Sequence, residues 1–163
     1  MESLTGKEKK IFLTVFLLLS VFIQVHGVNA NSRLDLTMSI VDNGDLDINE
    51  TYENTPDRAI YKDTYYSDKE PGLSLLATIP YSAWKTTYSS IGGNTTKISE
   101  PRGKLGEKNS VITTYAKNPG TFYLSSIIKV ILTTAVLPLS ILSILIYRIS
   151  KDFLDNEIRR LLI

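Results

Sequence analysis

The sequence predicts a mainly α membrane protein: a hairpin of two membrane-spanning helices joined by an extracytoplasmic loop that carries membrane-surface helices. Two apolar blocks support this prediction. Residues 11–28 contain no formal charge, and residues 122–147 contain one, on Lys129. The 163 residues hold 18 basic and 17 acidic side chains, for a formal net charge of +1, and most of the polar residues lie between and around the blocks. A single soluble core is therefore not expected.

Composition excludes several classes of function. The chain has no cysteine, which excludes disulfides, thiolate nucleophiles and zinc–thiolate sites. Its one histidine, His26, excludes a histidine-based triad or a multi-histidine metal site within this chain. The balanced charge, without a basic stripe, argues against nucleic acid as a partner. We predict neither a metal site nor a cofactor.

The first block reaches about 27 Å as a helix, close to the thickness of a bilayer's hydrocarbon core. The lysines of residues 1–10 precede it and predict a cytoplasmic N-terminus. A cleavable signal peptide is the alternative, because residues 28–30 weakly resemble a cleavage site. The length of the apolar run favours a retained anchor.

The second block is followed by Arg148 and Lys151, which predict a cytoplasmic C-terminus. Both termini would then be cytoplasmic, in a multi-pass protein of the cell membrane with residues 29–121 outside. Pro138 lies in the middle of this span and suggests a neighbouring membrane helix as a partner. Residues 148–163 have apolar side chains at helical spacing. They predict an amphipathic cytoplasmic tail, or alternatively the approach to a third span.

The outer segment predicts two surface helices. Apolar residues over 32–43 fit a helix, but they also fit a hairpin that turns at Asn43-Gly44. Residues 71–83 predict a helix lying on the membrane surface, with Pro71 in its first turn and Asp68 or a nearby residue as its cap. Residues 86–120 are rich in Ser, Thr, Gly and Asn and predict a mobile loop.

Two Asn-x-Thr patterns, at Asn49 and Asn94, are candidate glycosylation sites in this outer segment. Lys129, near the outer end of the second span, has two interpretations. It is a lysine whose ammonium reaches the headgroups, or it is a phosphate contact for a lipid-linked substrate.

Two stretches, RLDLTMSIVDNG from Arg33 and DRAIYKDTYYSDKEPGLSLLA from Asp57, resemble the N-terminal part of a known family. They look like the GT-C multi-spanning glycosyltransferases that use polyprenyl-phosphate sugars, such as protein mannosyltransferases and aminoarabinose transferases (glycosyltransferase family 39-like). The YSDKEPG run is the most specific part. The resemblance implies a chain truncated after the second span, and it favours a helix over the hairpin for residues 32–43.

The resemblance also implies a site. Transfer of a sugar to a hydroxyl needs a carboxylate to take the proton and cations to stabilise the departing phosphate. Asp35 and Asp68 are the candidate catalytic carboxylates, and Lys69 and Lys129 the candidate contacts to the lipid phosphate. The acidic residue that many members carry directly after the first span has no counterpart before Asp35. We therefore expect a glycosyltransferase-like protein that is inactive alone, with the bilayer and a polyprenyl-phosphate sugar as partners. A two-span membrane protein with a surface-exposed binding loop is the alternative.

Overall fold

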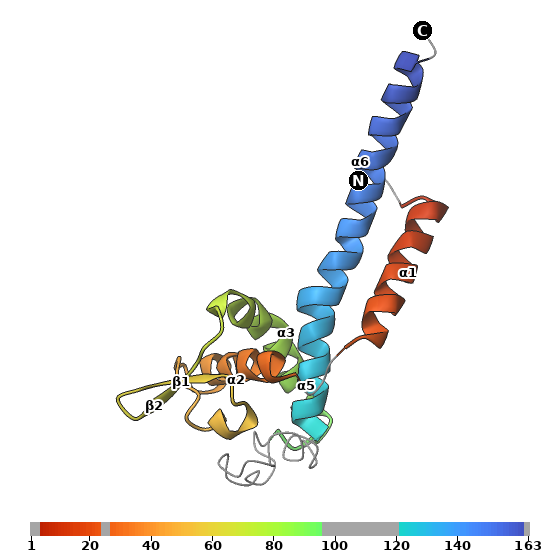
Figure 1. The fold of residues 1–163 in the computed structure, drawn as a ribbon. Coiled ribbons are helices and arrows are strands. Elements are labelled where there is room, and N and C mark those ends of the chain that lie inside the picture. Colours follow the sequence, from red (N-terminus) through yellow and green to blue (C-terminus); the bar gives the residue numbers. More distant parts are fainter. Residues whose placement is uncertain (1–3, 24–26, 96–120, 162–163) are drawn as a thin grey trace. The chain divides into compact units, whose positions relative to one another are not determined.

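The computed structural model describes residues 4–23, 27–95 and 121–161, and the prediction of a mainly α chain is confirmed. The chain divides into two compact units (Figure 1). One combines Met1–Ile23 with Ala135–Ile163 and is called here the helix pair. The other, Gln24–Thr134, is called the central unit.

The helix pair consists of α1 (Gly6–Val21) packed antiparallel against α6 (Leu137–Leu161), as Figure 1 shows. The helix at the predicted 11–28 segment has different bounds, Gly6–Val21. The helix begins earlier because Thr5 and Glu8 form a capping box around its first turn. It ends at Val21, where the Phe22 N–H bonds back to the Leu19 carbonyl at 3.2 Å.

One helix in the described part of the chain, Thr121–Lys151, is long and apolar enough to cross a membrane. It includes α5 (Thr121–Ile131), a π-helical segment (Leu132–Val136) and the first part of α6. The 16 residues of α1 make a helix of about 24 Å, shorter than the hydrocarbon core of a bilayer. By length and composition, then, the described residues contain one candidate span where two were predicted.

Pro138 accounts for the π-helical segment, because proline has no N–H to donate and its ring displaces the carbonyl one turn earlier. Hydroxyl groups satisfy carbonyls close to this break: Thr133 and Thr134 donate to the Val130 carbonyl at 3.1 and 2.7 Å. The helical backbone continues to Leu161. The amphipathic face predicted for 148–163 falls mostly outside the side chains that are described.

The core of the central unit lies between α2 (Val28–Asp42), α3 (Pro71–Ser90) and α5. Each of the three helices contributes apolar side chains, and aromatic rings fill the space between α3 and α5. The buried residues are Leu34 and Met38 from α2, Ala77 and Tyr81 from α3, and Phe122, Tyr123, Ile127 and Val130 from α5.

The helix over 32–43 is α2, and the alternative hairpin at Asn43-Gly44 does not form. Gly44 has φ +75°, which ends the helix in the left-handed conformation that glycine tolerates. Most side chains from Asn31 to Ser39 are buried within the unit. Placement of this helix on the membrane surface stays a prediction.

A β-hairpin that the sequence did not predict precedes α3. Strand β1 (Arg58–Tyr61) pairs antiparallel with β2 (Thr64–Ser67), and Figure 1 shows the hairpin extending away from α2. The two turn residues, Lys62 and Asp63, have φ values of 47° and 60°, as a two-residue type I′ turn requires. Neither is a glycine or an asparagine, so the turn lacks the usual sequence signal.

Helix α3 begins with Pro71 at its first position, as predicted, and its N-cap is Glu70, two residues after Asp68, without a capping hydrogen bond from the side chain. It extends to Ser90, past the predicted end at residue 83 and into the segment predicted to be a mobile loop. The hydroxyls of its last turns bond to their own helix, with Thr86 donating to the Ser82 carbonyl at 2.9 Å. Residues 96–120 of the predicted loop lie outside the described residues.

Candidate functional site

Asp35 lies on α2 and is completely buried, with 0% of its surface exposed. Its Oδ1 accepts hydrogen bonds from Asn54 Nδ2 at 3.0 Å and from the Tyr123 hydroxyl at 3.2 Å. Asn31, one turn earlier on α2, donates from Nδ2 to the Asn54 carbonyl at 3.1 Å. These contacts join α2 to α5 and to the short 3₁₀ helix Tyr52–Asn54.

This environment limits what Asp35 does chemically. A general base must reach the proton that it removes, within hydrogen-bond distance or through one water. A carboxylate with no exposed surface does not meet an acceptor from solvent while the unit stays closed. In this conformation Asp35 is a buried acceptor that ties together segments distant in the sequence.

Asp68 and Lys69 lie next to the hairpin and form one ion-pair cluster with Asp57. The Lys69 ammonium is 3.1 Å from Asp57 Oδ2 and 3.4 Å from Asp68 Oδ1. The Lys69 side chain is 22% exposed, that of Asp68 38%. The hydrogen bond to Asp57 is the main reason that the pKa of Lys69 is raised. Lys69 therefore stays charged, and two carboxylates already offset its charge.

The two stretches that carry the family resemblance contact each other directly. Ser32, one residue before the first stretch, bonds through Oγ to the Asp57 carbonyl and to Ser67 Oγ, both at 2.7 Å. Arg33 pairs with Glu70 at 3.5 Å, and Ser74 donates to the Arg33 carbonyl at 3.0 Å. Lys69 and Asp57 close the base of the hairpin in the same region.

Lys129 projects from α5 toward α3. Its ammonium lies 5.1 Å from the ring centre of Trp84, a cation–π contact, and its side chain is exposed. The Trp84 indole N–H donates to Ser125 Oγ at 3.1 Å, which fixes the ring against α5. The three candidate residues thus have different immediate partners. Asp35 contacts an amide and a hydroxyl, Lys69 contacts two carboxylates, and Lys129 contacts an aromatic ring.

The two candidate glycosylation sites differ in presentation. Asn49 lies in a turn, where its Oδ1 accepts the Tyr65 N–H at 2.9 Å, and the hydroxyl residue of its pattern, Thr51, is only 4% exposed. Asn94 is exposed shortly after the end of α3, and the last residue of its pattern lies outside the described residues. Asn49 itself is exposed, and only the hydroxyl residue of its pattern, Thr51, is buried.

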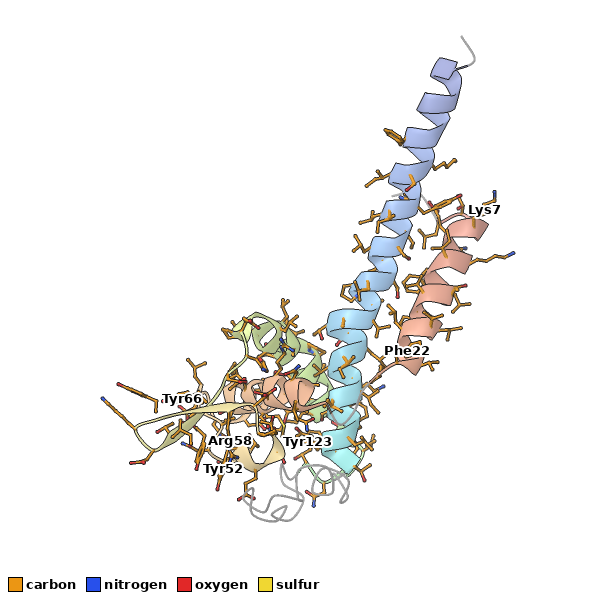
Figure 2. All side chains as sticks on the ribbon, viewed as in Figure 1. Lys7, Phe22, Tyr52, Arg58, Tyr66 and Tyr123 are labelled. Atoms are coloured by element: carbon orange, nitrogen blue, oxygen red, sulfur yellow. The ribbon has the colours of Figure 1, made fainter. Side chains whose placement is uncertain are left out.

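Sequence reasoning missed an aromatic cluster at the base of the hairpin, which Figure 2 labels at Tyr52 and Arg58. The rings of Tyr52 and Tyr65 stack with centres 4.1 Å apart and planes 5° from parallel. The Arg58 guanidinium carbon lies 4.8 and 5.1 Å from the two ring centres, and its Nη1 donates to the Tyr52 carbonyl. The carboxylate of Glu53 is the main cause that raises the pKa of Tyr52.

A second missed cluster joins α2 to α3. The Tyr81 hydroxyl donates to Asp42 Oδ2 at 2.9 Å, and Lys85 contacts Asp42 Oδ1 at 2.7 Å. Burial, followed by the charge of Asp42, holds the pKa of Tyr81 far above its usual range, so the hydroxyl stays a neutral donor. The spacing of Tyr81 and Lys85 places both on one helix face, which is the signal that the sequence offered.

The described residues contain no group of three His, Asp or Glu side chains suited to hold a metal ion. Comparison with protein-family models, with curated proteins and with solved structures finds no match to this chain.

Proposed function

We propose that this chain is a two-span membrane protein that resembles the N-terminal part of a polyprenyl-phosphate-sugar-dependent glycosyltransferase and does not transfer sugar by itself. The observation that supports it is the direct contact between the two stretches that resemble the family. They are separated in the sequence, yet Arg33 meets Glu70 and Ser74 in the fold. If both stretches derive from one structural module of the family, they should contact each other in the fold, as they do here.

The proposed membrane position rests on α3 and α5. Helix α5 is the first part of the apolar helix Thr121–Lys151, and α3 packs against it. On the outside of α3, Leu73, Leu76 and Ile79 are 45, 63 and 75% exposed. Trp84 and Lys129 meet at the same helix contact, and both residue types favour the headgroup level. We propose that α3 lies on the outer leaflet with these apolar side chains toward lipid.

The proposed lack of activity rests on the surroundings of the candidate residues. Asp35 has no exposed surface, and the charge of Lys69 is offset by Asp57 and Asp68. Stabilisation of a leaving phosphate requires cations aimed at it in a site that excludes water. The purified chain in lipid, assayed with several polyprenyl-phosphate sugars and hydroxyl acceptors, should show no turnover. Turnover that Asp35→Asn or Asp68→Asn abolishes would overturn this part of the proposal.

We expect the chain to bind a lipid phosphate although it does not catalyse sugar transfer, because a lysine near the headgroups attracts a phosphate without a complete active site. In nanodiscs, the chain should bind a fluorescent polyprenyl phosphate more tightly than the matching polyprenol. Lys129→Gln should weaken binding of the phosphate several-fold. Lys62→Gln, at an exposed position on the hairpin turn, is the matched control. Equal binding of the two lipids would contradict the proposed substrate class.

The proposed topology places both termini in the cytoplasm and residues 29–121 outside. The chain has no cysteine, so single cysteines introduced at Ser89 and Ser150 report accessibility without background. In intact cells an impermeant thiol reagent should label Ser89→Cys and spare Ser150→Cys. The reverse pattern would exclude the topology.

A binding loop without transferase ancestry is the second candidate. The stacked rings of Tyr52 and Tyr65, with the Arg58 guanidinium beside them, favour it, because such clusters are common in recognition surfaces. Under this alternative, Arg58→Gln and Tyr65→Ala should abolish partner capture, while binding of polyprenyl phosphate should not exceed that of polyprenol.

A further inference from the structure

A charged pair joins the two helices of the helix pair. Arg148 donates from Nε to Glu8 Oε1 at 2.6 Å. The Glu8 side chain is 5% exposed, although Glu8 lies in the first turn of its helix, whereas that of Arg148 is 44% exposed. The acidic partner is therefore the buried one, and its charge depends on α6 for compensation.

Glu8 uses both of its carboxylate oxygens. While Oε1 accepts from Arg148, Oε2 accepts the Thr5 N–H at 2.7 Å, and Thr5 Oγ1 accepts the Glu8 N–H at 3.4 Å. The capping box fixes the rotamer of Glu8 at the start of α1. Only an ionised carboxylate accepts from both partners at full strength, and the hydrogen bond from Arg148 is the main cause that lowers the pKa of Glu8 to about 2.

The pair sits at the charged ends of both apolar runs. Glu8 comes shortly before the run that starts at Ile11, and Arg148 directly follows the charge-free run Val130–Tyr147. Figure 2 labels Lys7, the neighbour of Glu8, and Phe22 at the two ends of α1. A carboxylate at the edge of a bilayer is costly when it lacks a partner, so separation of the helices would leave Glu8 unfavourably placed.

We propose that the Glu8–Arg148 ion pair is an interhelical latch, which holds α1 against α6 at the cytoplasmic membrane face and keeps α1 in the protein as a permanent partner helix. This inference rests on the proposed topology, in which both charged ends face the cytoplasm. It assigns a role to α1 beyond membrane targeting. A signal sequence that is released has no need of a buried carboxylate matched to a distant arginine.

Cysteine cross-linking of the full chain in its membrane tests the latch. Phe12 and Ile144 lie one helical turn from Glu8 and Arg148, toward the middle of the antiparallel pair, so Phe12→Cys with Ile144→Cys should cross-link through a short bis-maleimide. Glu8→Gln retains a side chain that completes the capping box but removes the charge. Lys9→Gln is the matched control, because it removes an exposed charge from the same turn and leaves the capping box and the ion pair.

Glu8→Gln and Arg148→Gln should each lower the cross-linking rate about threefold, the scale of interhelical polar contacts in membranes. The double variant should cross-link faster than Arg148→Gln alone, because it leaves no buried carboxylate without its arginine. Lys9→Gln should match the parent. Equal rates in all variants, or additive losses in the double variant, would overturn the latch.

Accessibility at Ser150 separates the two possible failures. If Ser150→Cys is labelled from outside, the proposed topology fails and the latch fails with it. If Ser150→Cys is protected and neither charge affects the cross-linking rate, the topology stands and the latch alone is refuted.

Discussion

Removal of the Tyr123 hydroxyl is the sharpest test of how the central unit is held together. Tyr123 is 5% exposed, and its hydroxyl reaches the fully buried Asp35 carboxylate across 88 residues of sequence. Tyr123→Phe preserves the ring and creates no cavity. The change removes the hydrogen bond to the Asp35 carboxylate, and a bond of this kind contributes about 1.5–3 kcal/mol to the free energy of unfolding. We expect a loss near the lower figure, because the 3.2 Å distance is long for such a bond.

A larger loss should follow when the acceptor itself is removed. Asp35→Leu leaves the Asn54 amide and the Tyr123 hydroxyl buried opposite an apolar side chain. Each unsatisfied buried donor costs about 1–3 kcal/mol, so the expected loss is about 2–6 kcal/mol. Tyr123→Phe in that background should recover part of the loss, because it removes the donor that Asp35→Leu deprives of the Asp35 carboxylate.

The assay is denaturant unfolding of the full chain in detergent, followed by tryptophan fluorescence. Trp84 is the one tryptophan of the sequence and packs against the core of the central unit, so its emission reports this unit. Tyr88→Phe is the control, since the Tyr88 ring packs on Phe122 with centres 5.3 Å apart and contributes chiefly through that packing. A loss in Tyr123→Phe no larger than in Tyr88→Phe would refute the role assigned to Asp35.

Three further outcomes are expected. Asp57→Asn and Lys69→Gln should each destabilise the central unit by up to about 1 kcal/mol in the same unfolding assay. The double variant should lose less stability than the two single losses added together, and additive losses would show that the ion pair contributes nothing. Spin labels placed singly along 71–83 should show lipid accessibility with a period near 3.6, highest at Leu76 and its helical neighbours, and a period of two would contradict a helix on the membrane surface. Because the folded pKa of Glu8 is lowered to about 2 from 4.5, its contribution to the contact between α1 and α6 should be complete above pH 4.5 and fall as the pH drops toward 2. The distance between spin labels at Phe12→Cys and Ile144→Cys, recorded from pH 6 to pH 3, measures this, and Glu8→Gln should remove the dependence.

The helices were predictable where apolar spacing and helix-start residues agreed. Pro71 before an apolar run located α3, and the long charge-free run located the helix Thr121–Lys151. Asn43-Gly44 was ambiguous because a tight hairpin turn and a helix end both need a residue with positive φ. The structure uses Gly44 to end α2.

Other elements had no usable local signal. The hairpin 58–67 turns at Lys62 and Asp63, two residues that rarely mark such a turn. The Ser and Thr residues at the end of α3 resembled a loop, because composition does not reveal that their hydroxyls bond to carbonyls of their own helix, as in Thr87 to Ala83 at 2.8 Å. Asn54 and Tyr123, which donate to Asp35, lie 19 and 88 residues away in the sequence, beyond the reach of any spacing rule.

The candidate site residues differ in the groups that already surround them. The resemblance implies that Lys69 contacts the lipid phosphate. A phosphate would, however, have to compete with Asp57 and Asp68 for the Lys69 ammonium. Lys129 differs, because the face of Trp84 attracts a cation without neutralising it and leaves its charge effective toward a third group. Phosphate binding should therefore depend more on Lys129 than on Lys69. Lys69→Gln should act mainly through the stability of the hairpin base, so a variant at this position that folds fully and still loses binding as strongly as Lys129→Gln would reverse the order.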